Sequence, residues 1–299
     1  MAITLTELAT NSGDKLVQGF INEIITDSYL LGAMTFDDCM TPNGTSDMVY
    51  GYKRIKTPMS AAFRSLNEEP TTSQVTFEKV TTNVGILSAS FPMDRVARDA
   101  ANDVYEANLE DEKNSIIRAF NKQVVGGDKD TETKAFDGLA KAVKGSSTEY
   151  TSAVDLATIT QTSALAFTTE MDTLLSSLMR TPDVLLVSPA MHVRINAIMR
   201  VLGLGTQTME TAGRPVQTYD NIPIQEMRDG CITNNDVYAA CLGMDGFHGI
   251  TLKGGSAITV SLPDWSAPGA VKNTEAEFVC GCALKATKAA GVLHQKAAA

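Results

Sequence analysis

Histidine, cysteine and acidic side chains are the residues of this sequence that could carry acid–base or nucleophilic chemistry. The histidines are His192, His248 and His294. His192 falls on a segment with helical spacing, where Glu170 or Cys241 could serve as its partner in a nucleophile–base pair. No spacing in the sequence links these residues, so a histidine on a helix surface is the favoured interpretation. We expect His248 to lie in a loop, in a packing or hydrogen-bonding role.

The cysteines show neither the spacing of a metal site nor that of a disulfide framework. They are Cys39, Cys231, Cys241, Cys280 and Cys282. Cys280 and Cys282 alternate like neighbours on one face of a strand, whereas structural zinc needs four ligands and usually two residues between paired cysteines. We therefore expect buried, reduced thiols in a reducing compartment, and neither a metal nor another cofactor.

Other short motifs do not have the residues that their chemistry requires. Asp128-Lys129-Asp130 begins like a calcium loop, but Thr133 stands where that loop needs glycine and Leu139 where it needs glutamate. Gly203-Leu204-Gly205 follows a helical segment and lacks the third glycine of a dinucleotide site. The sequence contains neither a GxxxxGK[ST] phosphate loop nor a GxSxG nucleophile elbow. We therefore expect a protein that is not an enzyme.

Composition further narrows the functional classes to which the protein could belong. The 299 residues carry a formal net charge of -10, and the pI of about 4.8 disfavours a protein that wraps nucleic acid by neutralising phosphates. Aromatic residues are only 6% of the chain, which disfavours a base-stacking platform. The first ten residues do not resemble a signal peptide, and no apolar run reaches the length of a membrane span. We expect a soluble protein made in the cytoplasm.

The first half of the chain predicts elongated elements. A short amphipathic helix is expected over 14–27, and residues 49–55 and 75–93 have the two-residue period of strands. The polar segment between these strands is too long for a tight turn, so they form an extended hairpin with little core of its own. Residues 93–125 contain apolar positions at helical spacing without a glycine or proline, and Gly126-Gly127 ends this long helix.

The second half alternates between helical and extended segments. Helices are expected over 164–178 and 189–201, and a buried strand over 183–187. Further strands are expected over 215–218, 222–226, 237–242 and 258–262, followed by a last extended run over 275–288.

The order of these elements and several phrases of the sequence resemble one family. The phrases are VVGGDKDTETKAFDGL (124–139), LLVSPAMHVRINAIMR (185–200), GRPVQTYDNIP (213–223), VYAACLGMDGFHGITLKGG (237–255) and TEAEFVCGCALKATKAAGVLH (274–294). Over nearly the whole chain they are similar to the major capsid proteins of tailed bacteriophages. This family has the Johnson fold, which is shared with encapsulins and herpesvirus capsid floors. The sequence has no long helical scaffolding extension ahead of the arm, which implies a separate scaffolding protein or a processed chain.

The resemblance implies an α+β capsid shell fold with four parts. They are an N-terminal arm with a short helix (1–45), an E-loop hairpin (46–92), a P-domain with the spine helix and long strands (93–153 and 271–290), and an α/β A-domain (154–270 and 291–299). It also implies self-assembly through hexamers and pentamers into an icosahedral shell around the double-stranded DNA of a tailed phage. The expected partners are other copies of the chain, a scaffolding protein, a portal and a decoration protein, in a virion assembled in the host cytoplasm.

Two alternatives to a phage capsid remain at this stage. An encapsulin-like nanocompartment would use the same fold to enclose an enzyme. An α/β hydrolase or transferase is disfavoured, because no nucleophile or phosphate motif is present.

The residues themselves predict a contact between copies of the chain. The rising strand and tip of the hairpin are basic, whereas the middle of the long helix, from Asp99 to Glu112, is rich in acidic residues. Since a hairpin without a core needs a neighbour to cover it, we expect its basic side chains to lie over the acidic helix of an adjacent subunit. The residues assigned to this contact are Arg54, Lys56, Arg64, Asp103, Glu106 and Glu110.

Overall fold

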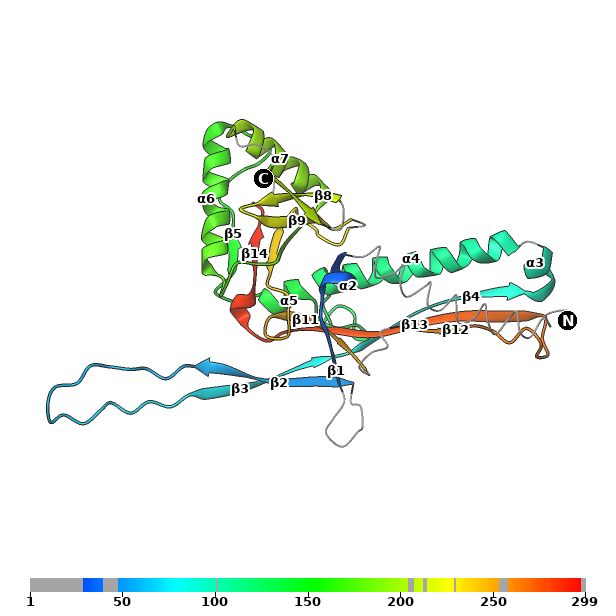
Figure 1. The fold of residues 1–299 in the computed structure, drawn as a ribbon, viewed down its shortest axis with the longest axis horizontal. Coiled ribbons are helices and arrows are strands. Elements are labelled where there is room, and N and C mark those ends of the chain that lie inside the picture. The colour runs from blue at the N-terminus through cyan, green and yellow to red at the C-terminus, as the bar shows by residue number, and fades with distance from the viewer. Residues whose placement is uncertain are drawn as a thin grey trace.

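The computed structural model describes residues 29–39, 48–100, 102–203, 207–211, 214–228, 230–252 and 258–296. The helix expected over 14–27 lies outside these residues. Three parts are visible in Figure 1: a long hairpin that projects to one side, a helix on a sheet that extends to the other side, and an α/β unit above them. Among the described residues, no helix is both long and apolar enough to span a membrane.

The projecting hairpin consists of β2 (Val49–Thr57) and β3 (Thr76–Asn83), which, among the described strands, pair only with each other in an antiparallel ribbon. The chain continues through β4 (Gly85–Asp94), which leaves the ribbon and pairs with β13 (Val271–Leu284) over ten residues. The extended run expected over 75–93 is therefore two strands with different partners.

The central layer is a five-stranded sheet that carries the long helix. β13 pairs with β4 along one edge and with β11 (Phe247–Thr251) and β12 (Ile258–Ser261) along the other, and β1 (Phe36–Asp38) joins β11. The expected long helix is α3 (Arg95–Ala100) followed by α4 (Asn102–Gly126), and α2 (Tyr29–Ala33) lies beside α4 (Figure 1). β11 and β12 fall within the range expected for the A-domain but pair with β13.

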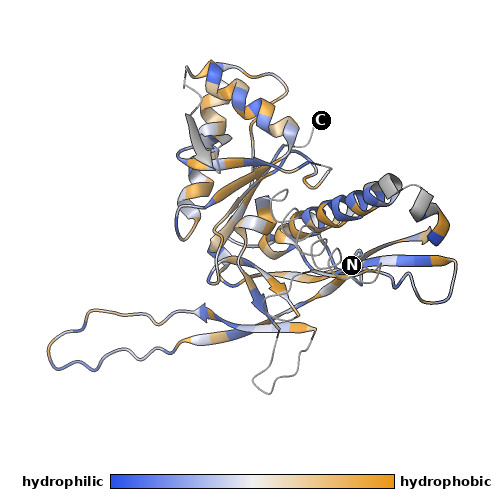
Figure 2. Cartoon of the chain, turned by 45° about the vertical axis from the view of Figure 1, so that its right-hand side comes forward, coloured by the Kyte–Doolittle hydropathy of each residue, from blue (hydrophilic) through white to orange (hydrophobic). Residues whose placement is uncertain are grey.

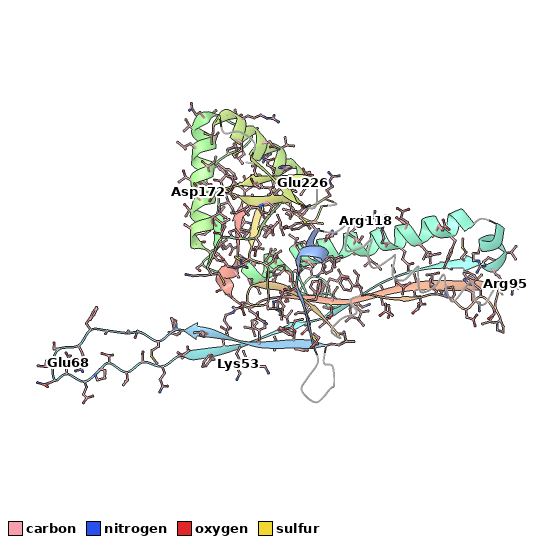
Figure 3. All side chains as sticks on the ribbon, viewed as in Figure 1. Lys53, Glu68, Arg95, Arg118, Asp172 and Glu226 are labelled. Carbon is pink, nitrogen blue, oxygen red and sulfur yellow. The ribbon has the colours of Figure 1, made fainter. Side chains whose placement is uncertain are left out.

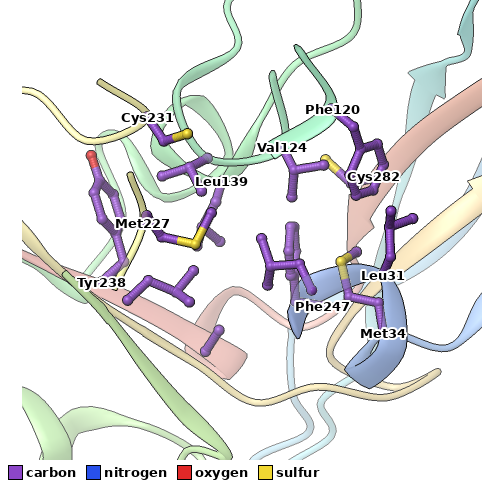
Figure 4. Packing of buried hydrophobic residues seen from close by; sticks show 14 of the residues in the cluster. Leu31, Met34, Phe120, Val124, Leu139, Met227, Cys231, Tyr238, Phe247 and Cys282 are labelled. Atoms are coloured by element: carbon purple, nitrogen blue, oxygen red, sulfur yellow. The ribbon is translucent and has the colours of Figure 1, made fainter. Parts of the chain in front are cut away.

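The main core lies between α4 and the inner face of this sheet. Phe120 and Val124 of α4 pack with Phe247, Phe278 and Cys282 of the strands, all of them fully or almost fully buried (Figure 4). The core-facing positions of α4 recur every three or four residues, as an amphipathic helix requires. Hydrophilic residues gather on the side of α4 turned away from the sheet (Figure 2).

The upper unit is a seven-stranded sheet covered by two helices. Its strands are ordered β5-β14-β10-β6-β9-β8-β7. Their bounds are β5 Glu149–Thr151, β6 Val184–Val187, β7 Gln207–Thr211, β8 Arg214–Tyr219, β9 Ile222–Glu226, β10 Val237–Ala240 and β14 Ala290–His294. The helices α6 (Gln161–Ser177) and α7 (Pro189–Val201) pack against it, and the short α5 (Leu139–Val143) packs near the end of α4. The helices expected over 164–178 and 189–201 are thus confirmed.

Local sequence accounts for where several of these helices begin. Ser188 accepts a hydrogen bond from the Met191 backbone N–H, and Pro189 occupies the first turn, so α7 starts directly after the buried strand β6. Thr160 and Ser163 form a capping box at the start of α6. Asp94 accepts a bond from the Val96 N–H at the start of α3.

Candidate functional site: the hairpin, its base and the open sheet face

The two faces of the hairpin have different surroundings. Tyr50, Tyr52 and Arg54 alternate on the side that faces the body and are partly buried. On the other side Lys53 lies directly opposite Lys79, and Figure 3 shows Lys53 turned away from the body. Beyond this lysine pair the apolar pair of Ile55 and Phe77 is 57% and 66% exposed. One side of the ribbon therefore anchors it, and the other side is left for solvent or a partner.

Arg54 is bound within its own chain. Its Nε donates to the Lys285 carbonyl oxygen at 2.9 Å and its Nη2 to the Leu284 carbonyl oxygen at 2.8 Å. The Tyr52 hydroxyl donates to the same Leu284 oxygen at 2.8 Å, and the guanidinium lies 5.8 Å from the Tyr52 ring centre. The sequence assigned Arg54 to a neighbouring subunit, whereas these contacts fix the base of the hairpin to the end of β13.

A second group of contacts secures the hairpin base at Tyr50. Its hydroxyl donates to Asp37 Oδ2 at 2.6 Å, and Lys285 Nζ lies 3.9 Å from the same oxygen. The Tyr50 ring meets His248 edge-on, with ring centres 5.7 Å apart. Burial, followed by the hydrogen bond to the Asp37 carboxylate, raises the pKa of Tyr50 well above its ordinary value. The hydroxyl therefore stays protonated and continues to donate.

The outer half of the hairpin makes no contact with the body. Lys56 is exposed at a register shift between Ile55 and Thr57, and Arg64 donates from Nη1 to the Glu68 carbonyl oxygen at 3.0 Å within the tip. Met59, Phe63 and Leu66 are among the most exposed large apolar side chains of the described chain. A solitary chain gains nothing from this exposed apolar surface, which is typical of a surface that another protein covers.

The acidic run of α4 does not lie on a single exposed face. Glu106 and Glu110 are exposed, as the proposed contact requires, and the side chain of Asp103 lies outside the described residues. Glu112 and its neighbour Lys113 are buried instead, with relative exposures of 6% and 4%. Glu112 lies three residues after Leu109 and four before Ile116, so the helical period turns it toward the sheet.

A second acidic surface lies on the opposite side of the sheet from α4. Glu275 and Glu277 of β13 are exposed on this outer face, while the intervening Ala276 is buried beneath the helix. Small polar residues flank both glutamates: Ser88 and Thr259 lie beside Glu277, and Ser90 and Ser261 beside Glu275.

The same outer face has a covered half and a bare half. Tyr50 and Tyr52 of the hairpin base cover its far end at Val279 and Ala283, whereas the outward-facing residues of 271–277, which are Val271, Asn273, Glu275 and Glu277, are exposed. Sequence reasoning missed this face, although the alternation of Glu275, Ala276, Glu277 and Phe278 indicates it.

His192 is not paired with Glu170 or Cys241 in the structure. His192 is held between Glu226, at 2.5 Å from Nδ1, and the Gln217 side-chain oxygen, at 2.6 Å from Nε2. The two partners considered and disfavoured in the sequence lie elsewhere: Glu170 accepts from Ser152 and the Ala153 N–H, and the Cys241 thiol contacts the Arg180 carbonyl. All five cysteines are buried free thiols, as expected.

The remaining candidate sites also have structural roles. His248 lies in the middle of β11 rather than in a loop and is fully buried. In the turn that was compared with a calcium loop, the Lys141 ammonium binds both Asp128 and Asp130 and fills the place of a cation. Within the described ranges, no three histidine, cysteine or acidic side chains are grouped to hold a metal ion.

The chain was compared with known families and structures. No family model matches it, and no curated protein matches its sequence. Solved structures of capsids and of an encapsulin align with the chain over most of their length. The SrpI encapsulin complex from Synechococcus elongatus PCC 7942 has a TM-score of 0.63, with 11% identity over 89% of this chain and 86% of that chain. The capsid of a native GTA particle has a TM-score of 0.63, with 13% identity over 90% of each chain. The capsid of Myoviridae phage XM1 has a TM-score of 0.57, with 11% identity over 90% and 91%.

These likenesses show the fold. The chain has the α+β shell fold found in phage capsids and in an encapsulin, and the fold class expected from the sequence is confirmed.

Proposed function

We propose that the chain is the major capsid protein of a tailed phage, a structural subunit that assembles through hexamers and pentamers into an icosahedral shell around double-stranded DNA. The observation that carries this proposal is a whole-chain capsid fold whose hairpin exposes apolar side chains that its own body does not cover. The proposed role is structural, without turnover of a substrate. The net charge of -10 suits a container, since an acidic wall does not hold the packaged DNA.

The proposed partners follow from this role. Other copies of the chain form the shell, and a separate scaffolding protein, a portal and a decoration protein complete the particle. Assembly takes place in the host cytoplasm and the final location is the virion.

The test of the shell function is microscopy of the full-length purified chain, together with light scattering over a range of protein and salt concentrations. We expect rings of five or six subunits and closed shells, because repeated head-to-tail contacts close into rings. Replacing residues 58–73 by a short turn should leave a folded subunit that forms no shells. A chain that stays monomeric under all these conditions would overturn the proposal.

The likeness to an encapsulin gives the second candidate, a nanocompartment that encloses a protein. The contents of particles isolated from the native source separate the two. Nuclease-protected double-stranded DNA supports the phage capsid, whereas a co-purified folded enzyme supports the nanocompartment.

The hairpin is the proposed contact between subunits. Lys56 and Arg64 remain available in its outer half, whereas Arg54 holds the base. The hairpin leaves the body along the outer face of the sheet and projects away from the bare half of that face (Figure 1). A copy placed next in line would therefore offer its own bare sheet face to the hairpin.

Position and charge favour Glu275 and Glu277 as the acidic side of this contact over Glu106 and Glu110. Extended residues 56–66 span about 36 Å, which is enough to cover the open stretch at 271–277, about 23 Å at about 3.3 Å per residue. Ile86, which is 58% exposed beside Val279, offers the apolar tip of the hairpin a partner. The helix face with Glu106 and Glu110 lies on the other side of the sheet.

Charge reversal distinguishes the two surfaces. The variant Lys56→Glu/Arg64→Glu should assemble poorly while it still folds, because several exposed pairs of about 0–1 kcal/mol each are replaced by repulsions. Assembly of the parent should weaken as the salt concentration rises, because salt screens exposed charges. Adding Glu275→Lys/Glu277→Lys should restore part of the loss. Rescue by Glu106→Lys/Glu110→Lys instead would return the contact to α4, and no effect of any reversal would show that the hairpin docks without these charges.

A further inference from the structure

A histidine is enclosed beneath the hairpin base without a hydrogen bond of normal geometry. His248 of β11 is 0% exposed, and neither ring nitrogen has a partner at such geometry, although the Gly246 backbone lies near the ring. It is paired in register with Ala283 of β13, on the outer face of the sheet that Tyr50 and Tyr52 cover. A buried imidazole with both nitrogens unsatisfied is costly, and it becomes far more costly if it gains a charge.

The groups around His248 come from four parts of the chain. They are Tyr50 on β2, with Tyr52 and Arg54 following it; Asp37 on β1, with Cys39 after it; Lys285 at the end of β13; and Asp245 in the turn before β11. Burial and then the Lys285 ammonium lower the pKa of His248, against smaller opposite effects of the Gly246 backbone, Asp37 and Asp245. The histidine is therefore neutral while the hairpin is docked.

Within the described part of the chain, a few side-chain bonds hold the hairpin base over this histidine. They are the bond from Tyr50 to Asp37, the bond from Tyr52 to the Leu284 carbonyl, and those from Arg54 to the Leu284 and Lys285 carbonyls. All of them arise from one strand, so they break together if β2 lifts. The same movement exposes His248 to water, and its imidazole can then accept a proton.

We propose that Tyr50 and His248 form a pH-sensitive latch at the hairpin base: the neutral imidazole keeps the hairpin docked, and protonation of the uncovered imidazole holds it open. Since a proton binds the open form preferentially, each pH unit below about 6.5 increases the ratio of open to docked chains by up to about tenfold. Because the latch lies within one chain, this inference does not depend on what an assembled shell encloses.

The chain contains its own probe of the open form. Cys39 is buried in the small cluster with Tyr50 and Tyr52, whereas Cys231 is buried in the main core. Lifting β2 should make the Cys39 thiol accessible and leave Cys231 protected.

The experiment labels the full-length, unassembled chain with 4,4′-dithiodipyridine, which reacts with thiols at acidic pH, and locates the label by peptide mass spectrometry. The variant His248→Phe keeps an aromatic ring beside Tyr50 but cannot be protonated. Between pH 7.5 and 5.5, Cys39 labelling of the parent should rise about tenfold relative to that variant, while Cys231 labelling stays low.

Equal pH dependence in parent and variant would overturn the latch, and so would a parallel rise at Cys231, which would indicate general loosening. If His248→Phe does not fold, the comparison of Cys39 with Cys231 in the parent decides. As a positive control, the variant Tyr50→Leu lacks the hydrogen bond to Asp37, so its Cys39 should be labelled at both pH values.

Discussion

Glu112 gives a prediction that the sequence alone would not. Its carboxylate lies in the core-facing stripe of α4, and neither oxygen has a hydrogen-bond partner of normal geometry. Burial raises its pKa from the ordinary 4.5 to about 7; the nearby Ala276 backbone opposes this rise, and the Glu275 charge adds to it slightly. The folded chain therefore favours the neutral acid.

The magnitude follows from linkage between protonation and folding. A rise of about 2.5 in pKa corresponds to about 3.5 kcal/mol in total, at about 1.4 kcal/mol per pKa unit. Because the folded-state pKa is raised, the stability is fully present below pH 4.5 and is lost as the pH rises to about 7. Above pH 7 the folded chain bears the whole cost of a buried carboxylate.

The assay is urea unfolding of the full chain, kept unassembled at low concentration, between pH 5 and 8. Glu112→Gln keeps the shape of the side chain and removes the titration, so its stability relative to the parent should increase by about 2.5 kcal/mol between pH 5 and 8. A constant offset between the two proteins is irrelevant, because only the pH-dependent part reports Glu112. Glu110→Gln, at an exposed position of the same helix, is the matched control and should follow the parent. A flat difference between Glu112→Gln and the parent would refute the reasoning.

Three further predictions concern stability and the thiols. Arg54→Ala removes the charged donor to the Leu284 and Lys285 carbonyls and should cost about 1.5–3 kcal/mol, seen as faster hydrogen exchange in β2 and β3 but not in β6. Gly138→Ala should destabilise the chain by about 1–3 kcal/mol in thermal unfolding, because its Cβ would lie 2.5 Å from the Gln123 carbonyl oxygen; Gly51→Ala, with ordinary contacts from 3.6 Å, should be tolerated. The five buried cysteines should form no cross-links, so a non-reducing gel of assembled particles should show single chains, and a reductant-sensitive ladder would contradict this.

Periodicity was sufficient to predict the elongated elements. The helical spacing over 93–125 is realised as α3 and α4, and the glycines at 126 and 127 end the helix as expected. The two-residue period of 49–55 is realised as the half-buried alternation of β2. These signals are local, because one face of each element is buried and the other is exposed along its whole length.

Sequence reasoning was wrong where burial has no simple period. All five residues of β11 are buried, so no alternation marks it as a strand, and Gly249 and His248 resemble loop residues. Gly249 is required there because a Cβ would lie 2.3 Å from the Phe36 ring.

Glu112 was counted with an acidic surface because charge was read along the sequence rather than around the helix. Arg54 was assigned to a partner because its true acceptors are backbone carbonyls more than 200 residues away.

The arrangement of the hairpin relative to the sheet bears directly on how copies of the chain can associate. The anchored base of the hairpin lies on the same side of the sheet as the bare half of the outer face. The hairpin projects toward one end of the molecule, however, and the bare half extends toward the other end (Figure 1). A surface and its complement at opposite ends cannot satisfy each other in a two-fold dimer through a single patch, since such an interface pairs a patch with itself. They can be satisfied head to tail, and a head-to-tail contact closes into a ring or continues as a filament according to its rotation. The angle at which the hairpin leaves the body contributes to that rotation. Tyr50, Tyr52 and Arg54 fix this angle, so the contacts of three side chains on one strand bear on whether the copies close into a shell.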